Sequence, residues 1–142
     1  MSNDVIPLFD ELIYPRWFDH DAMGHINHVQ YFRYLEEARV NWIVKGKLEA
    51  LSAGGKHAMV VASGGLDFRA EWRHPNPLRA RAWVRRIGNT SFTLYQSLHS
   101  EDGEILVADG DMTFVWVDVD QHRPQPVSES LRKVLSKSLL SD

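Results

Sequence analysis

The stretch from His28 to Lys45 constrains the fold of this chain most strongly, because it carries the longest helical periodicity in the sequence. Apolar side chains recur there at steps of three and four residues. They are Val29, Phe32, Leu35, Ala38 and Trp42. Asn27 is suited to cap the start of this helix, and Lys45 followed by Gly46 is typical of a helix end. We therefore predict one long helix that is buried along much of its length.

The segments on both sides of this helix show the two-residue alternation that is typical of β-strands. One strand is predicted before the helix, at Leu8–Trp17. The strands predicted after it are Met59–Trp72 (one strand, or two with a break near Gly64-Gly65), Leu78–Ile87, Ser91–Glu101 and Glu104–Val117. Turn residues separate these runs, and Asp102-Gly103 is typical of a tight hairpin.

Two shorter helices are also predicted. One is a short helical piece at Leu48–Ala53. The other is an amphipathic helix near the C-terminus, which Ser128 is suited to cap. Its apolar stripe is formed by Leu131, Val134, Leu135 and Leu139.

This order of elements predicts an α+β fold in which an antiparallel sheet wraps around one long central helix, with a further helix at the C-terminus. The helix at 28–45 is the only predicted element large enough to cover the apolar face of such a sheet. The sheet keeps long edges and an outer face, so self-association is expected. No repeat or linker divides the 142 residues, which predicts a single domain over 1–142.

Composition removes several classes of function. The chain has no cysteine, which excludes disulfides, thiolate metal sites and a cysteine nucleophile. Its formal net charge of −3 argues against a nucleic-acid partner. No signal-peptide pattern and no apolar run of about 18 residues are present, so no membrane association is expected. We therefore expect a cytoplasmic protein.

The loop before the long helix gathers the residues best suited to chemistry. It holds two carboxylates (Asp19 and Asp21), the imidazoles of His20 and His25, and Gly24. A helix N-terminus presents free backbone N–H groups and a partial positive charge, which stabilise an oxyanion. A carboxylate placed beside those donors can attack a thioester carbonyl or activate water to do so.

The run D-x-D-x-x-G-H-x-N-x-x-x-Y, from Asp19 to Tyr31, resembles the hot-dog acyl-CoA thioesterases of the 4-hydroxybenzoyl-CoA thioesterase type. The Leu35-Glu36-Glu37-Ala38-Arg39 sequence in the helix belongs to the same resemblance. Weaker similarity covers the chain from about Tyr14 to Pro126 and includes Asp102-Gly103, Ala108-x-Gly110, Val117-Asp118 and Arg123-Pro124. The resemblance implies a hot-dog fold and hydrolysis of an acyl-CoA or aryl-CoA thioester to the free acid and CoA. It implies no metal and no cofactor.

The resemblance also implies a role for each residue of the motif. Asp21 is the catalytic carboxylate, Gly24 lies in the turn, and a backbone N–H near His28 polarises the thioester carbonyl. His25 also matches a histidine of the plant acyl-ACP thioesterases, where it is functional, so it is expected to orient Asp21 or to shuttle a proton. Met23 replaces the polar residue of that plant motif, so the rest of its constellation is not carried over.

Substrate contacts follow from the same resemblance. Asn27 and Tyr31 are expected to contact the substrate, although a helix cap and core packing explain them as well. The CoA-binding segment corresponds to Arg85, Arg86, Asn89 and Thr90. The pantetheine arm is expected in a groove between subunits, which implies a homodimer or homotetramer that shares the active site.

Several alternatives stay open at this point. Asp21 could serve only to accept hydrogen bonds within the loop, and Asp19 is expected to be structural. Glu36 and Glu37 are expected to pair with Arg39 and Arg33, although some hot-dog thioesterases use a helix glutamate for catalysis. An acyl-ACP thioesterase and a non-catalytic acyl-CoA-binding protein are the alternative functions.

Overall fold

The computed structural model describes residues 5–45 and 56–141 of the chain. Its elements are β1 (Phe9–Ile13), the short 3-10 turn η1 (Trp17–Asp19), α1 (His28–Lys45), β2 (His57–Gly64), β3 (Asp67–Phe68), β4 (Leu78–Ile87), β5 (Ser91–Ser100), β6 (Leu106–Asp118) and α3 (Glu129–Ser136). No helix within these residues is long and apolar enough to cross a membrane. Gly46 and the helical piece predicted at Leu48–Ala53 lie outside the described residues.

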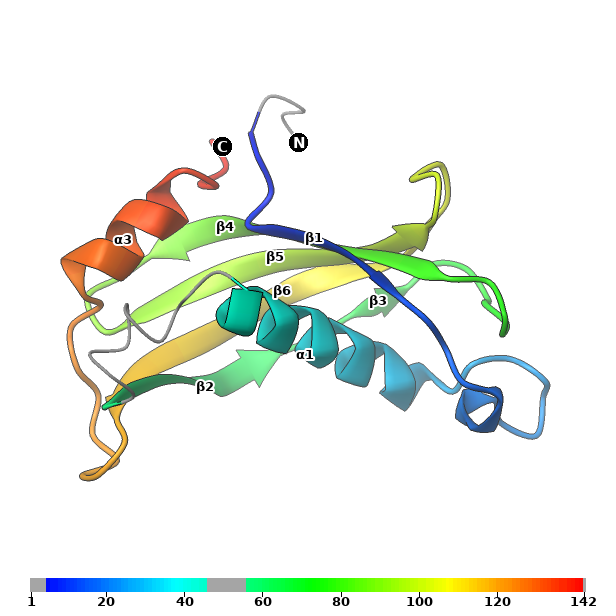
Figure 1. Ribbon diagram of the computed structural model, residues 1–142, viewed down its shortest axis with the longest axis horizontal. Coiled ribbons are helices and arrows are strands. Elements are labelled where there is room, and N and C mark those ends of the chain that lie inside the picture. Colours follow the sequence, from blue (N-terminus) through cyan, green and yellow to red (C-terminus); the bar gives the residue numbers. More distant parts are fainter. Residues whose placement is uncertain (1–4, 46–55, 142) are drawn as a thin grey trace.

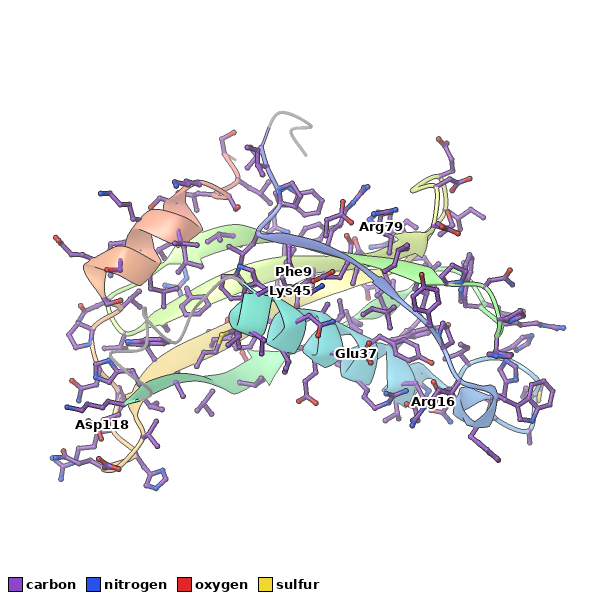
Figure 2. All side chains as sticks on the ribbon, in the orientation of Figure 1. Phe9, Arg16, Glu37, Lys45, Arg79 and Asp118 are labelled. Carbon is purple, nitrogen blue, oxygen red and sulfur yellow. The ribbon has the colours of Figure 1, made fainter. Side chains whose placement is uncertain are left out.

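The strands form one antiparallel sheet in the order β1-β4-β5-β6-β2, and β3 pairs with β6 beside β2. Figure 1 shows this sheet curling around α1, with α3 at one end and the loop that enters α1 at the other. Lys45, labelled in Figure 2, lies at the far end of α1. It ties this end to the sheet, because its Nζ atom lies 3.1 Å from a carboxylate oxygen of Glu11 on β1. The predicted α+β architecture, a sheet around one long helix, is confirmed.

The core lies between α1 and the inner face of the sheet. One buried cluster packs Tyr34, Leu35 and Ala38 of α1 against β1 and β4. A second cluster continues toward α3, where Leu131 and Leu135 are buried. The alternation predicted for β6 is present, because its even-numbered inner residues Ala108, Met112, Phe114 and Trp116 are buried. Burial of these apolar faces is what holds α1 and the loop before it in a fixed position.

Both predicted helix caps are present. The Asn27 side-chain oxygen accepts the Val29 N–H at 3.0 Å, and the Ser128 hydroxyl oxygen accepts the Leu131 N–H at 3.2 Å. The predicted apolar stripe of the C-terminal helix is too long, because α3 ends at Ser136. Leu139 instead pairs with Val84 at the end of β4.

Two predicted strands are also too long. β1 ends at Ile13, because the chain turns at Pro15, which fixes φ and lacks an N–H, and enters η1 at Trp17. The segment predicted as Met59–Trp72 forms two strands with the break at Gly65, and the residues after Phe68 leave the sheet. The chain from 69 to 77 is thereby free to pass beside the loop that precedes α1.

The ion pair predicted between Arg33 and Glu37 is wrong, and Glu36 acts on Arg39 through its charge without forming a close ion pair. The Arg33 guanidinium lies 2.9 Å from Asp19 rather than on Glu37. Arg39 is buried, donates to the side-chain oxygen of Gln96 at 3.2 Å, and stacks 5.0 Å from the ring centre of Phe114. Tertiary partners displaced the local ones because a surface ion pair on one helix contributes only about 0.3–0.5 kcal/mol.

Candidate active site

The loop from His20 to Asn27 is closed on itself by backbone hydrogen bonds. Asp21 N–H donates to the His25 carbonyl at 2.8 Å, and Gly24 N–H donates to the Asp21 carbonyl at 3.1 Å. Gly24 has φ of 80°, and no atom lies within 4 Å of where its Cβ would be. The left-handed backbone conformation, rather than lack of space, therefore favours glycine in this turn.

Asp19 forms the inner side of this loop. Its side chain is 1% exposed and accepts hydrogen bonds from the Tyr34 hydroxyl at 2.5 Å, the Arg16 N–H at 2.9 Å and Arg33 at 2.9 Å. Burial disfavours its charge, but the bonds from Tyr34 and Arg16 and the charge of Arg33 outweigh burial and lower the pKa of Asp19. Asp19 thus joins η1 to α1, which is the structural role predicted for it.

Asp21 forms the outer side of the loop and is exposed to solvent. Its Oδ1 atom accepts the Met23 N–H at 2.9 Å, which fixes the orientation of the carboxylate. Within residues 5–45 and 56–141, no donor contacts the second oxygen. Asp21 therefore accepts a hydrogen bond within the loop, as a purely structural aspartate would. Its other carboxylate oxygen still faces solvent, where a substrate could reach it.

The N-terminus of α1 lies directly after this loop. Asn27 takes up the Val29 N–H, but in the described part of the chain no acceptor contacts the N–H of His28. The His28 ring packs edge-on against Phe68, with ring centres 5.4 Å apart. An N–H of this kind, at a helix start and beside the Phe68 ring, is suited to bind a carbonyl oxygen as it gains negative charge.

Tyr31 lies one turn further along α1 and is 3% exposed. Its ring packs against Phe68, with ring centres 5.7 Å apart. Burial, followed by the negative charges of Glu71 and Asp21, raises the pKa of Tyr31 to about 12. The phenol therefore stays protonated at physiological pH, and both carboxylates act within electrostatic reach of the first turns of α1.

The segment that follows β3 holds the loop from the other side. Ile26 N–H donates to the Trp72 carbonyl at 2.9 Å, and His74 N–H donates to His20 Nε2 at 3.0 Å. Glu71 Oε2 lies 3.0 Å from His25 Nε2. Glu71 is not among the residues predicted from the sequence, because it lies far from the motif along the chain and no local pattern marks it.

The structure separates the residues predicted to bind CoA from the rest of the predicted site. Arg85 pairs with Asp111 at 3.1 Å and stacks over Tyr95, and Arg86 donates to the Ser91 hydroxyl at 3.4 Å. In the turn after β4, the Asn89 carbonyl accepts the Val127 N–H and the Thr90 carbonyl accepts the Trp116 N–H. From Leu78 to Arg85, β4 covers about 24 Å at its usual rise per residue. Within one protomer, this turn and Asp21 therefore lie at opposite ends of the sheet.

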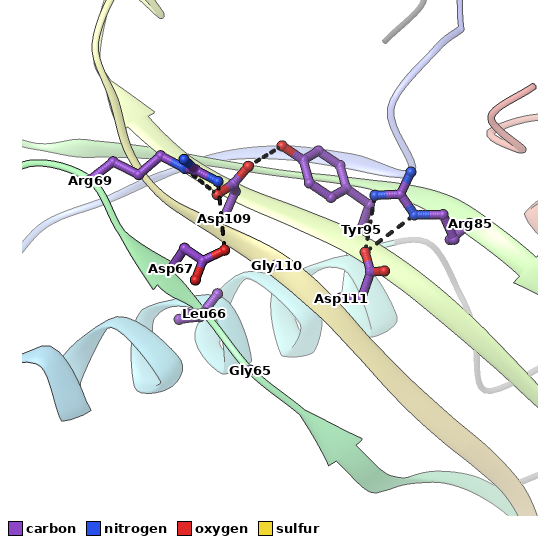
Figure 3. Close-up of a pocket in the computed structure, with 9 residues that line it drawn as sticks. All are labelled: Gly65, Leu66, Asp67, Arg69, Arg85, Tyr95, Asp109, Gly110 and Asp111. Carbon is purple, nitrogen blue, oxygen red and sulfur yellow. Dashed lines mark hydrogen bonds and ion pairs between the residues drawn. The ribbon is translucent and has the colours of Figure 1, made fainter. Parts of the chain in front are cut away.

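A separate hollow of about 500 Å³ lies on the outer face of the sheet, and Figure 3 shows its lining. Asp109 accepts hydrogen bonds from Arg69 and from the Tyr95 hydroxyl, both at 2.6 Å. The Arg85–Asp111 pair lies in the same hollow. These charges neutralise one another, so the hollow offers less reactive chemistry than the loop at Asp21.

Comparisons with known proteins place this chain in a family. The model of the thioesterase-like superfamily matches residues 15–135. FadM of Escherichia coli, a long-chain acyl-CoA thioesterase, is 24% identical over 122 residues, which are 86% of this chain and 92% of FadM. YsmA of Bacillus subtilis is 30% identical over 89 residues, 63% of this chain, and the match spans only 59% of YsmA.

The fold recurs in solved structures. The PA2801 protein of Pseudomonas aeruginosa superposes with a TM-score of 0.81 and 30% sequence identity. The match covers 90% of this chain and 98% of that protein. The chain therefore belongs to the thioesterase-like superfamily, and its fold is the hot-dog fold of those enzymes.

Proposed function

We propose that this protein hydrolyses acyl-CoA thioesters to the free acid and CoA. Three findings support the proposal: membership of the thioesterase-like superfamily, similarity to a long-chain acyl-CoA thioesterase, and the geometry of the loop before α1. A cytoplasmic location also stays a prediction, which cell fractionation would test.

One observation carries the chemistry. Asp21 has one carboxylate oxygen without a donor among the described residues, and it lies on the loop that ends at His28, whose N–H has no acceptor among them. The thioester carbonyl accepts this N–H, and the partial positive charge of the helix start stabilises the oxygen as it becomes an anion. Asp21 then attacks the carbonyl carbon as nucleophile, or removes a proton from the water that attacks it.

A second copy of the chain would complete the substrate groove. β2 is one of the two edge strands of the described sheet, and Val60 and Val61 on it are 50% and 48% exposed. Val40 and Val44 on α1 are also exposed. An unpaired strand edge beside exposed apolar side chains is typical of an interface.

Antiparallel pairing of β2 with β2 of a second copy would join opposite ends of the two sheets. The turn at 88–91 of one copy would then come to the same end as Asp21 of the other. This arrangement accounts for the predicted CoA-binding residues, which lie too far from Asp21 within one protomer. We therefore propose a homodimer with a shared site, and Val61→Glu should yield an inactive monomer in sedimentation velocity.

A thiol-release screen tests the proposed activity. The substrates are acyl-CoAs from acetyl to palmitoyl and an aryl-CoA. The chain has no cysteine, so the protein gives no background with a thiol reagent. Asp21→Asn should lower kcat/KM by at least about 100-fold, the usual contribution of a catalytic acid or base, without a change in melting temperature.

Asp120→Asn is the matched control, because Asp120 is exposed in a turn at the far end of the sheet. Its rate should equal that of the wild type. Absence of hydrolysis with every CoA ester, together with hydrolysis of carrier-protein esters, would transfer the assignment to the acyl-ACP class. Tight acyl-CoA binding without any turnover would instead identify a binding protein.

A further inference from the structure

One nitrogen of His25 has two side-chain neighbours of opposite charge. Its Nε2 atom lies 3.0 Å from Glu71 Oε2 and 3.2 Å from Arg73 Nη2. The His25 side chain is 21% exposed, whereas the Glu71 side chain is 76% exposed. A largely enclosed imidazole is thus reached by a carboxylate and a guanidinium from the solvent side.

These two neighbours require different states of the Nε2 atom, one bare and one carrying a proton. A guanidinium can only donate, so Arg73 needs a bare Nε2; a carboxylate can only accept, so Glu71 needs an Nε2–H. The nitrogen cannot satisfy both at once. The tautomer with a bare Nε2 bonds to Arg73, and the tautomer with Nε2–H bonds to Glu71. In the imidazolium both nitrogens carry a proton, so the charged ring can bond only to Glu71.

The other ring nitrogen is available to a substrate. Among the residues described, nothing bonds to Nδ1 of His25. The charged groups that contact the ring are Glu71 and Arg73, both from the segment after β3. The charges of Glu71 and Asp21 also act on Tyr31 of α1. Backbone hydrogen bonds hold His25 in place. The His25 carbonyl accepts the Asp21 N–H, and the Ile26 N–H donates to the Trp72 carbonyl.

Building on the hydrolase activity proposed above, we propose that Glu71 is a positioning residue that holds His25 as the proton carrier of the reaction. When Asp21 takes a proton from the attacking water, the new C–O bond forms and the C–S bond breaks. The departing thiolate receives a proton from Nδ1 of the His25 imidazolium. The proton on Asp21 then passes to the neutral imidazole, and both groups return to their starting states.

The same relay serves the nucleophilic alternative. If the Asp21 carboxylate itself attacks the carbonyl, the imidazolium gives its proton to the thiolate as the C–S bond breaks. A mixed anhydride is left on Asp21. Water then cleaves this anhydride and gives its proton to the neutral imidazole. In both routes Glu71 stabilises the protonated ring, much as a triad carboxylate orients and stabilises a histidine.

The first test is the pH dependence of kcat/KM for Glu71→Gln, measured with the best substrate of the screen. We expect a fall on the order of 10- to 100-fold, below the full effect of a catalytic acid, because Glu71 acts through His25. The alkaline limb of the pH profile should move to lower pH, because loss of the carboxylate disfavours the protonated ring. Glu37→Gln, an exposed change on α1 (Figure 2), is the matched control and should alter neither rate nor profile.

Arg73→Gln provides a test of opposite sign. Removal of the guanidinium favours the protonated ring, so the alkaline limb should move to higher pH. A merely structural role of the two side chains would not produce opposite shifts. The melting temperature of Glu71→Gln will show whether that variant folds. If it does not, the pH profile of Arg73→Gln still tests whether charged neighbours of His25 control its protonation.

A double variant tests the dependence on His25. His25→Gln with Glu71→Gln should be no slower than His25→Gln alone, because Glu71 has no ring left to hold. Multiplied losses, or a Glu71→Gln profile equal to that of Glu37→Gln, would overturn the role of Glu71. An active wild type with an inactive Asp21→Asn variant would leave the proposed hydrolase function intact in that case.

Discussion

The two sides of the loop before α1 differ sharply, although their aspartates are only two residues apart. On the inner side, Asp19 is buried and accepts hydrogen bonds from Arg16, Arg33 and Tyr34. On the outer side, Asp21 is exposed and accepts one local hydrogen bond, from Met23. The number of donors that the fold supplies, rather than the residue type, separates a structural carboxylate from one available for chemistry.

The difference between the two aspartates also explains how an exposed loop can hold a defined geometry. The inner carboxylate ties η1 to α1, and the segment after β3 fixes the loop at Ile26 and His20. Asp21 therefore extends from a framework that is held on both flanks. A reactive group needs such support to keep its distance from the donor it works with. The predictions below test how independent the two sides are.

The largest effect on stability is expected from Asp19→Asn. The variant leaves Arg33, Arg16 and Tyr34 without a charged acceptor, and we expect a loss of about 2–3 kcal/mol, since both arginines keep access to water. Urea denaturation measures this loss. Asp21→Asn serves as the control and should change the unfolding free energy by no more than about 0.5 kcal/mol. Equal losses for the two variants would remove the distinction between the sides.

Acid should weaken the inner side selectively. The folded state lowers the pKa of Asp19, so at low pH the unfolded chain takes up this proton before the folded chain does. The stability that Asp19 contributes is therefore present above its ordinary pKa of 3.8 and is lost as pH falls toward the folded value. Between pH 7 and pH 3, the difference in unfolding free energy between wild type and Asp19→Asn should become smaller, which urea denaturation at each pH will show. A gap that does not change with pH would contradict the ionic origin of the effect.

A smaller loss is expected where the loop enters the helix. Asn27→Ala removes the cap on the Val29 N–H and should cost about 1 kcal/mol. Thermal unfolding will show it. The matched control is Asn41→Ala within α1, where alanine is the better helix former and no loss is expected. If both variants melt at the wild-type temperature, the cap does not support the outer side.

The smallest effect is expected at Tyr31. Its pKa of about 12 means that the hydroxyl stays protonated between pH 6 and pH 10. If Tyr31 contacts the substrate as expected, Tyr31→Phe removes one hydrogen bond to it. The variant should therefore lower kcat/KM by only about 2- to 10-fold, without changing the shape of the pH profile. Tyr14→Phe, at an exposed position, is the control. If one limb of the pH profile of kcat/KM is missing in Tyr31→Phe, Tyr31 titrates during the reaction.

Much of the fold could be predicted from the sequence because it depends on short-range periodicity. The apolar spacing of α1 and the alternation of β6 each report which face of an element is buried. Strand ends were predicted less well: the turn at Pro15 ended β1 early, and Leu139 left the C-terminal helix to pair with Val84. Such boundaries depend on contacts outside the element.

The candidate site shows the same limit. The motif from Asp19 to Tyr31 predicted the loop as the candidate site, since its residues are adjacent in the chain. It could not show that Arg33 would choose Asp19 over Glu37, that Glu71 would reach His25, or that Arg85 would lie at the other end of the sheet. The sequence by itself determined which elements form and which loop carries the carboxylates. Only the tertiary structure decided which charges meet, because side chains far apart in the chain come within 3 Å only after the sheet has closed around α1.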